Sequence, residues 1–294
     1  TATPASLDAQ ARLTPFADWP LQALQLRTQG LDLSALAPSL PATSLTGHAD
    51  LQGGTAGTPL QLDLALDNAR PGRWTEAHLP LRSAQLTLAA RPQRPHLLEL
   101  QALALELGDD RGRAGSVSGS GRWEGGTFAL DTHVRQLQPG RLDARLPALR
   151  LDGPLALQLQ GFTLPGSAAS PATAPAPLEL RLDTDLRGQQ DERLPARLQA
   201  ALQARREGPA EAAHWTLDVQ EFAAHAGSAQ AQVRGQVVFE PSGAWQARSQ
   251  GQLKSFDPTA WWPAAPADTV LDGDWNAQLS APAGQPLPQA LRGQ

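Results

Sequence analysis

Leucine alternates with polar residues along much of this chain, and this alternation restricts its fold more than any other feature. Between residues 60 and 66 every second residue is Leu, and the residues between them are Gln, Asp and Ala. A period of two places all apolar side chains on one face of a β-strand. The same period recurs in the stretches 128–134, 155–159, 178–186, 215–219, 233–239 and 275–279. The pattern predicts an all-β, antiparallel sheet with one apolar and one solvated face.

Proline and glycine support the same fold class. The chain has 26 Gly and 26 Pro among 294 residues. Proline inside a helix removes a backbone hydrogen bond and clashes with the preceding turn. Long helices are therefore excluded over most of the chain, and short strands joined by turns remain.

Two stretches are irregular. Leu194–Arg206 fits a helix as well as a strand, and we assign it to a strand. In the stretch 98–107 the leucines change parity near Gln101, which predicts a β-bulge or short turn at that position.

A weak internal repeat indicates how the strands are connected. The sequence after Trp123 contains a glycine turn, an alternating stretch, LQPG and then LDG. The sequence after Phe239 contains a glycine turn, an alternating stretch, FDP and then LDG, and a fainter copy spans residues 31–47. Each copy predicts a strand, a proline-containing crossover and further strands. Stacked repeats of this kind form an elongated rather than a globular domain.

We expect residues 1–294 to form a single continuous segment of a longer protein, since the chain begins at Thr1 without Met and stops within a strand-like pattern. The stretch 165–177 is rich in Pro, Ala and Ser, and predicts a flexible loop. If the segment 1–294 is divided into smaller parts, this stretch is the candidate boundary between them.

Residues that could carry chemistry are few. Cysteine is absent, the six histidines are scattered, and the formal charge of -5 is spread without a basic stripe, which argues against nucleic-acid binding. The glycine- and serine-rich run Gly115–Gly121 matches neither a nucleophile elbow nor a phosphate loop, and we interpret it as a strand edge or turn. Asp272 and Asp274 begin like a calcium loop, but Ala277 stands where that loop needs Gly. We therefore expect no catalytic residue, no metal site, no cofactor and no enzymatic activity.

Several short motifs together resemble a known family. They are a Trp or Phe after a glycine turn, a short alternating strand, an LQP or FDP step and an L-x-G return. The stretch from Asn68 to Pro80 and the step Leu31–Leu33 add to the likeness. With these motifs the chain resembles the TamB family of translocation and assembly module proteins, and related AsmA-like proteins are similar.

The resemblance implies a twisted antiparallel sheet curled into a U-shaped groove with an apolar interior (a β-taco). It implies a periplasmic location, in a protein anchored in the inner membrane of a diderm bacterium through parts outside this chain. It further implies phospholipid transport between the two membranes, and support of outer-membrane protein assembly with an Omp85-type, TamA-like barrel as the partner of the full-length protein.

Joined to the alternation, the resemblance predicts which side chains face lipid. These candidates are the apolar residues of four alternating stretches: Leu60, Leu62, Leu64, Leu66, Leu155, Leu157, Leu159, Leu178, Leu180, Leu182, Trp215, Leu217 and Val219. The alternative is a structural or adhesive β-solenoid or β-sandwich of a cell-envelope or surface protein, in which the same residues fill a closed core.

Overall fold

The structure is a computed structural model that describes residues 5–14, 21–53, 58–91, 94–146, 148–161, 177–190, 194–208, 212–257, 270–283 and 292–293. In these residues it is almost entirely β, which confirms the predicted fold class. The strands are β1 Ser6–Leu13, β2 Leu21–Leu31, β3 Leu45–Gln52, β4 Leu60–Asn68, β5 Leu81–Arg91, β6 Arg94–Asp109, β7 Gly112–Glu124, β8 Thr127–Leu137, β9 Leu149–Gln160, β10 Leu178–Gln190, β11 Leu194–Glu207, β12 His214–Ala226, β13 Ala229–Phe239, β14 Trp245–Phe256, β15 Leu271–Ala281 and β16 Arg292–Gly293. Three short helices complete the described elements: η1 Leu33–Ala35, η2 Trp74–Glu76 and α1 Pro139–Leu142.

The strands are hydrogen-bonded in sequence order from β1 to β16. The chain divides into two compact units. The first contains Thr1–Gly125 and Leu130–Asp152, and the second contains Gly126–Ala129 and most of the chain from Gly153 onward. Pairing is antiparallel from β1 to β7 in the first unit. It is antiparallel from β10 to β16 in the second.

Both irregular stretches form strands. The stretch from Leu194 belongs to β11, which pairs with β10 and β12 along its length. The change of parity in β6 is a bulge, because Thr87 pairs with Ala102 while Leu88 pairs with Leu100, which leaves Gln101 unpaired with β5. The bulge returns the leucines on both sides of Gln101 to the same face, as the sequence predicted.

One prediction about a single element is wrong. The run Gly115–Gly121 lies inside β7 rather than at a turn. A Cβ on Gly119 would lie 2.1 Å from the carbonyl oxygen of Asp131, so glycine permits a close approach of β8. Trp74 lies in η2 with 53% of its surface exposed. The stretch 165–177 lies, apart from Pro177, outside the described residues.

The same local geometry occurs at three strand connections. The backbone N–H of Gln136 donates to Asp152 Oδ1 at 2.9 Å, and that of Ser255 donates to Asp272 Oδ1 at 2.7 Å. In the first unit the N–H of Gly30 donates to Thr46 Oγ1 at 3.2 Å. Each donor has a positive φ, and each acceptor is the middle residue of an L-D-G or L-T-G triplet. We name this contact the triplet clasp. It joins the end of one strand to the strand that follows the crossover.

Removing a triplet clasp should destabilise the fold modestly. We expect Asp152→Ala to lower the free energy of unfolding by about 1 kcal/mol, because the Gln136 N–H loses its charged acceptor near the surface. Urea unfolding followed by circular dichroism measures this. Asp131→Ala, which removes an exposed carboxylate from β8, serves as the control and should change stability by less than about 0.5 kcal/mol. Equal effects of the two substitutions would contradict a specific role for the clasp.

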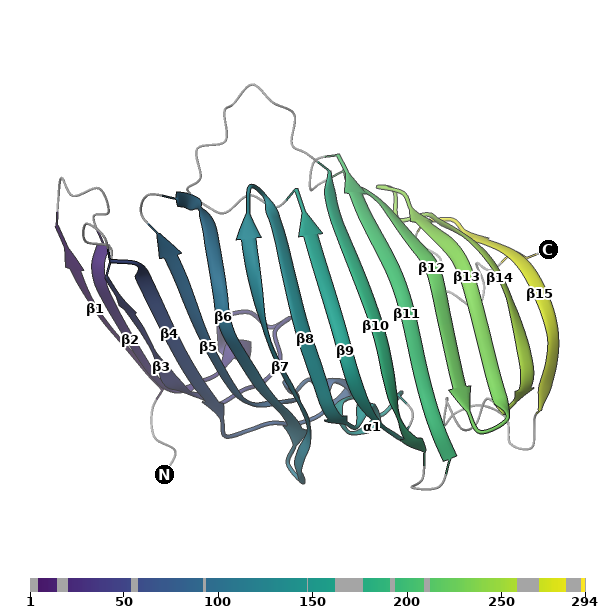
Figure 1. Cartoon of the computed structure of the whole chain (residues 1–294), viewed down its shortest axis with the longest axis horizontal. Coiled ribbons are helices and arrows are strands. Elements are labelled where there is room, and N and C mark those ends of the chain that lie inside the picture. Colours follow the sequence, from purple (N-terminus) through teal and green to yellow (C-terminus); the bar gives the residue numbers. More distant parts are fainter. Residues whose placement is uncertain are drawn as a thin grey trace. The chain divides into compact units, whose positions relative to one another are not determined.

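The crossovers of the first unit lie at one end of its strands (Figure 1). They follow β2, β4 and β8, and the first two are joined by a hydrogen bond from the Ala42 N–H to the Ala77 carbonyl at 2.8 Å. The most deeply buried large side chains also lie at this end: Leu151, Val134, Thr43 and Asp109. The best-formed core of the first unit is therefore at the crossover end.

Asp109 and Arg141 form a buried ion pair at this end. The side chain of Asp109 is 1% exposed, and the Arg141 guanidinium contacts both of its carboxylate oxygens. Arg141 also donates to the carbonyl oxygens of Gly112 and Arg113, at 3.1 and 2.8 Å. Burial raises the pKa of Asp109, but the hydrogen bond and charge of Arg141 outweigh burial, so that the pKa lies below its usual value.

Candidate functional site

One face of the first unit is apolar across seven strands. The pairing places leucines opposite leucines, as in Leu62–Leu88, Leu64–Leu86 and Leu51–Leu62. Three rows of residues cross the sheet from β1 to β7. They are Ala11–Leu24–Leu51–Leu62–Leu88–Leu100–Gly121, Ala9–Leu26–Ala49–Leu64–Leu86–Leu103–Gly119 and Leu7–Thr28–Gly47–Leu66–Ala84–Leu105–Val117. None of these residues is charged.

The four predicted residues of β4 lie together on this face. Leu60 is buried, but Leu62, Leu64 and Leu66 are only half-buried although they lie in the middle of the sheet. Mid-strand leucines beneath a second packed layer would be closed off from solvent. A cavity of about 160 Å³ opens on the face; it is lined by Leu7, Leu26, Arg27, Thr28, Leu31, Gly47, His48, Ala49, Leu64 and Leu66. The face therefore retains room and accessible apolar surface.

The second unit has a similar apolar face. The predicted residues Leu180 and Leu217 both pair with Ala204, and Leu182 and Val219 both pair with Leu202. Four rows cross β10 to β15 with only apolar or small neutral side chains. They are Leu180–Ala204–Leu217–Val237–Ala247–Leu279, Leu182–Leu202–Val219–Gly235–Ser249–Ala277, Thr184–Ala200–Phe222–Val233–Gly251–Trp275 and Leu186–Leu198–Ala224–Ala231–Leu253–Gly273.

The remaining predicted residues also share this face. A Cβ on Gly153 would lie 3.1 Å from the Cα of Leu186, so Gly153 lies beside the apolar row of β10. Leu155, Leu157 and Leu159 follow Gly153 at a spacing of two in β9 and occupy the same face. Leu178 and Trp215 flank Arg206 in a fifth row at the end of the strands.

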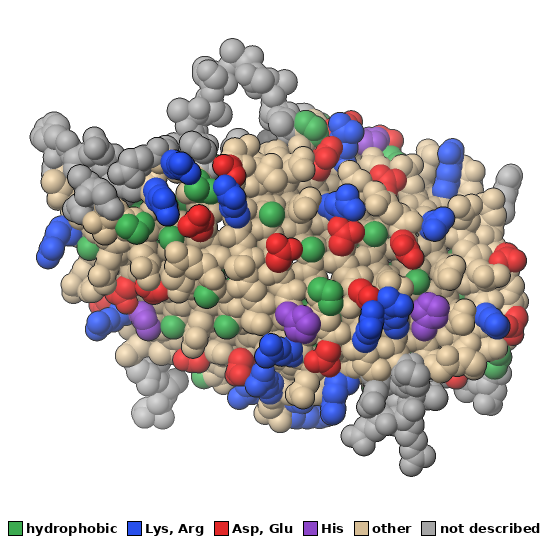
Figure 2. All heavy atoms as spheres, in the orientation of Figure 1, with side chains coloured by type: hydrophobic (Ala, Val, Ile, Leu, Met, Phe, Trp, Pro, Cys, Tyr) green, Lys and Arg blue, Asp and Glu red, His purple; other side chains and the backbone are tan. Residues whose placement is uncertain are grey.

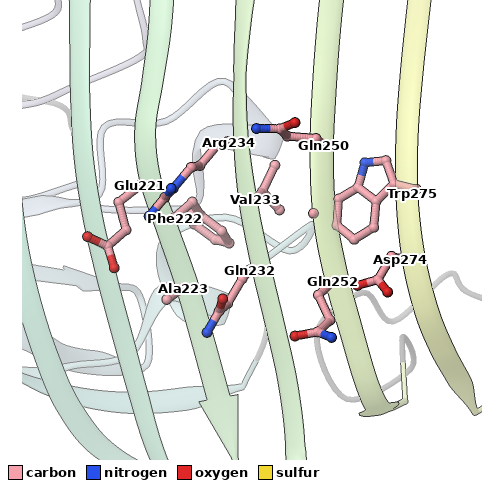
Figure 3. A pocket seen from close by; sticks show the side chains of 11 residues that line it. Glu221, Phe222, Ala223, Gln232, Val233, Arg234, Gln250, Gln252, Asp274 and Trp275 are labelled. Carbon is pink, nitrogen blue, oxygen red and sulfur yellow. The ribbon is translucent and has the colours of Figure 1, made fainter.

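A cavity of about 380 Å³ lies along the row from Phe222 to Trp275 (Figure 3). Gly251 leaves space that the indole of Trp275 occupies, because a Cβ there would lie 2.3 Å from the ring. The indole N–H donates to Ser249 Oγ at 3.1 Å. Alternate positions of the same strands contribute Gln232, Gln250 and Asp274 to the lining. With Glu221 and Arg234 also in the lining, the cavity combines aromatic and aliphatic carbon with amide, carboxylate and guanidinium groups.

The opposite faces carry the charged residues. Figure 2 shows Arg, Asp, Glu and His side chains spread over one face of the molecule. In the second unit Asp185 receives two hydrogen bonds of 2.8 Å from Arg197, and these hold the pKa of Asp185 at about 2. Arg205 lies 3.4 Å from Glu179 and 3.0 Å from Glu207. The sheet of the second unit is therefore amphipathic, with ion pairs on one side and hydrocarbon on the other.

Sequence reasoning missed part of both faces. Leu51 in β3 and Leu86 and Leu88 in β5 lie beside the predicted leucines of β4, and the alternation in their strands was a usable signal. Arg206 had no such signal, because its position on the apolar side depends on the pairing of β11 with β10 and β12.

The described residues contain no group of three or more His, Asp or Glu side chains placed to hold a metal ion. Within the same residues, the helices are too short and too polar to cross a membrane. A comparison of the chain with protein families, with curated proteins and with solved structures gave no match to any of them. The function of the apolar faces is therefore inferred from their strand pairing, their burial and their cavities.

Proposed function

We propose that the apolar faces of the two units bind phospholipid acyl chains, and that the chain is a non-catalytic segment of a lipid-conducting β-groove. One observation carries the proposal. The central rows of the first unit contain no charge, yet Leu62, Leu64 and Leu66 remain half-exposed. A large accessible apolar surface on a protein usually marks a binding surface.

The energetics favour an acyl chain as the occupant. Burial of one methylene contributes about 0.8 kcal/mol, and a linear chain can lie along a strand or across the leucine rows without needing a polar partner. The ion-paired opposite face keeps the sheet solvated while the apolar face is occupied. The arrangement thus separates hydrocarbon from water with a single layer of protein.

The resemblance to the TamB family extends the proposal. It supports a periplasmic segment of an inner-membrane-anchored protein that carries phospholipid between the membranes. It also supports cooperation of the full-length protein with an Omp85-type barrel in outer-membrane protein assembly.

A charge placed on the apolar face should abolish lipid binding there. We expect Leu64→Lys to lower the amount of phospholipid captured by a photo-crosslinker at Leu62 by about tenfold, because a desolvated ammonium is unfavourable beside acyl chains. The chain is expressed in a diderm bacterium, and crosslinked lipid is quantified by mass spectrometry. Ala65→Lys is the matched control, since Ala65 pairs with His48 and Gln85 on the polar face. Equal capture by the two variants, or no captured lipid in the unmodified chain, would contradict the proposal.

A further inference from the structure

A row of aromatic residues and one arginine crosses the end of the strands in the second unit. Arg206 pairs with Leu178 on one side and with Trp215 on the other. The row continues through Phe239, Trp245 and Ala281. Arg206 is the penultimate residue of β11, Trp215 is the second residue of β12, and Trp245 is the first of β14. The row therefore lies where the apolar face ends.

Arg206 is the one charged residue in the five rows that cross β10 to β15 on this face. Its neighbour Arg205 points to the opposite face, where Glu179 and Glu207 pair with it. In the described part of the chain no carboxylate lies within 4.0 Å of the Arg206 guanidinium. The guanidinium instead lies over the Trp215 ring, 6.0 Å from its centroid.

The Nε–H of Arg206 is buried and has no hydrogen-bond acceptor among the described residues. A buried donor without a partner is unfavourable, and the penalty is larger for a charged group. Stacking on an indole leaves the edge of a guanidinium free to donate two parallel hydrogen bonds, and phosphate accepts this bidentate geometry well. An anion at the edge of the guanidinium would therefore supply the charged acceptor that the described residues do not provide.

We propose that Arg206 binds the phosphate of a phospholipid whose acyl chains lie on the apolar face of the second unit; this inference rests on the function proposed above. Trp215 and Phe239 are 39% and 43% exposed. Aromatic side chains at the end of an apolar surface suit the level at which headgroup and hydrocarbon meet. From Arg206 to Ala200 the strand extends roughly 20 Å, which exceeds half of the ~30 Å hydrocarbon core of a bilayer. The site fixes the lipid's direction, with the headgroup at the Arg206 end of β11 and the chains toward Leu198.

The experiment measures the affinity of the purified chain for three probes below their aggregation concentrations. They are a short-chain phosphatidylglycerol, the diacylglycerol with the same chains, and inorganic phosphate. We expect the unmodified chain to bind phosphatidylglycerol about tenfold more tightly than diacylglycerol, because only the phospholipid supplies the missing charged acceptor. Arg206→Met should abolish this preference and leave diacylglycerol binding unchanged. Arg206→Lys, which keeps the charge, should retain part of the preference.

Arg205→Met is the matched control, one residue away on the ion-paired face, and should keep the full preference. Circular dichroism and the urea midpoint establish that each variant is folded. An unchanged preference in Arg206→Met would overturn the headgroup site and leave the proposed acyl-chain function intact. Binding of neither lipid by the unmodified chain would overturn both. Binding of inorganic phosphate as tight as that of phosphatidylglycerol would also overturn the inference, since the site would then recognise the free anion rather than a lipid.

Discussion

Replacement of Arg141 by Met is expected to lower the free energy of unfolding by about 3 kcal/mol at neutral pH. The side chain of Asp109 is 1% exposed, and Arg141 is its charged partner. Removing one member of a buried ion pair leaves an uncompensated charge and is destabilising by about 3–5 kcal/mol, whereas the intact pair contributes much less. We expect the lower end of that range because Arg141 is itself 27% exposed, so water can reach the vacated site.

The pH dependence of this variant should be opposite in sign to that of the unmodified chain. In the unmodified chain the pKa of Asp109 is below its usual 3.8, so its stabilising contribution is present at neutral pH and is lost as the pH falls below about 4. Without Arg141, burial raises the pKa of Asp109 above its unfolded value. The variant then regains stability as the pH falls through that raised pKa.

Urea unfolding at pH 7 and at a series of pH values down to about 2, below the usual pKa of a carboxyl group, tests both points. Arg181→Met serves as the control, because Arg181 and Asp183 are 54% and 42% exposed and pair at the surface. Such pairs contribute about 0–1 kcal/mol. Adding Asp109→Asn to Arg141→Met should restore part of the lost stability. A loss below about 1 kcal/mol in Arg141→Met would show that the pair is not an important part of the crossover-end core.

Leu151→Ala is expected to have an effect of similar size. Leu151 is 1% exposed and lies near the start of β9, at the crossover end. Truncation of a buried leucine removes its transfer free energy and leaves a cavity, which together destabilise by about 2–5 kcal/mol. Since single domains have about 5–15 kcal/mol of stability in total, this variant should unfold at a clearly lower urea concentration.

Leu157→Ala is the informative comparison for Leu151→Ala. Leu157 lies in the same strand but is only half-buried, on the proposed lipid face. We expect a loss of stability about half as large, because less surface leaves water on folding. Its main effect should fall on lipid capture instead. Equal destabilisation by the two substitutions would indicate that the apolar face is a closed core, as the solenoid or sandwich alternative requires.

Different parts of the first unit provide its stability and its accessible apolar surface. At the crossover end of the first unit, the Asp109–Arg141 pair and Leu151 are closed off from water. In the middle of the strands the leucines of β4 are accessible. A fold stabilised at its strand ends can leave its central apolar rows available for a ligand without losing its structure.

The sequence by itself determined the strands and the faces of their side chains. A period of two is a local property, so the residues of β4, β10 and β12 could be assigned to one face without knowing their neighbours. The bulge at Gln101 followed from the same parity argument. The strand assignment of β11 was also correct, although its sequence fits a helix as well.

Tertiary structure decided everything that depends on which residues lie opposite one another. Asp109 and Arg141 are far apart in sequence, and no pattern in either stretch marks them as partners. The run Gly115–Gly121 resembles a turn until the close approach of β8 is known. Arg206 resembles any surface arginine until pairing places it on the apolar face beside Trp215. Register between strands is fixed by non-local pairing, and a shift of one residue would move each of these side chains to the other face.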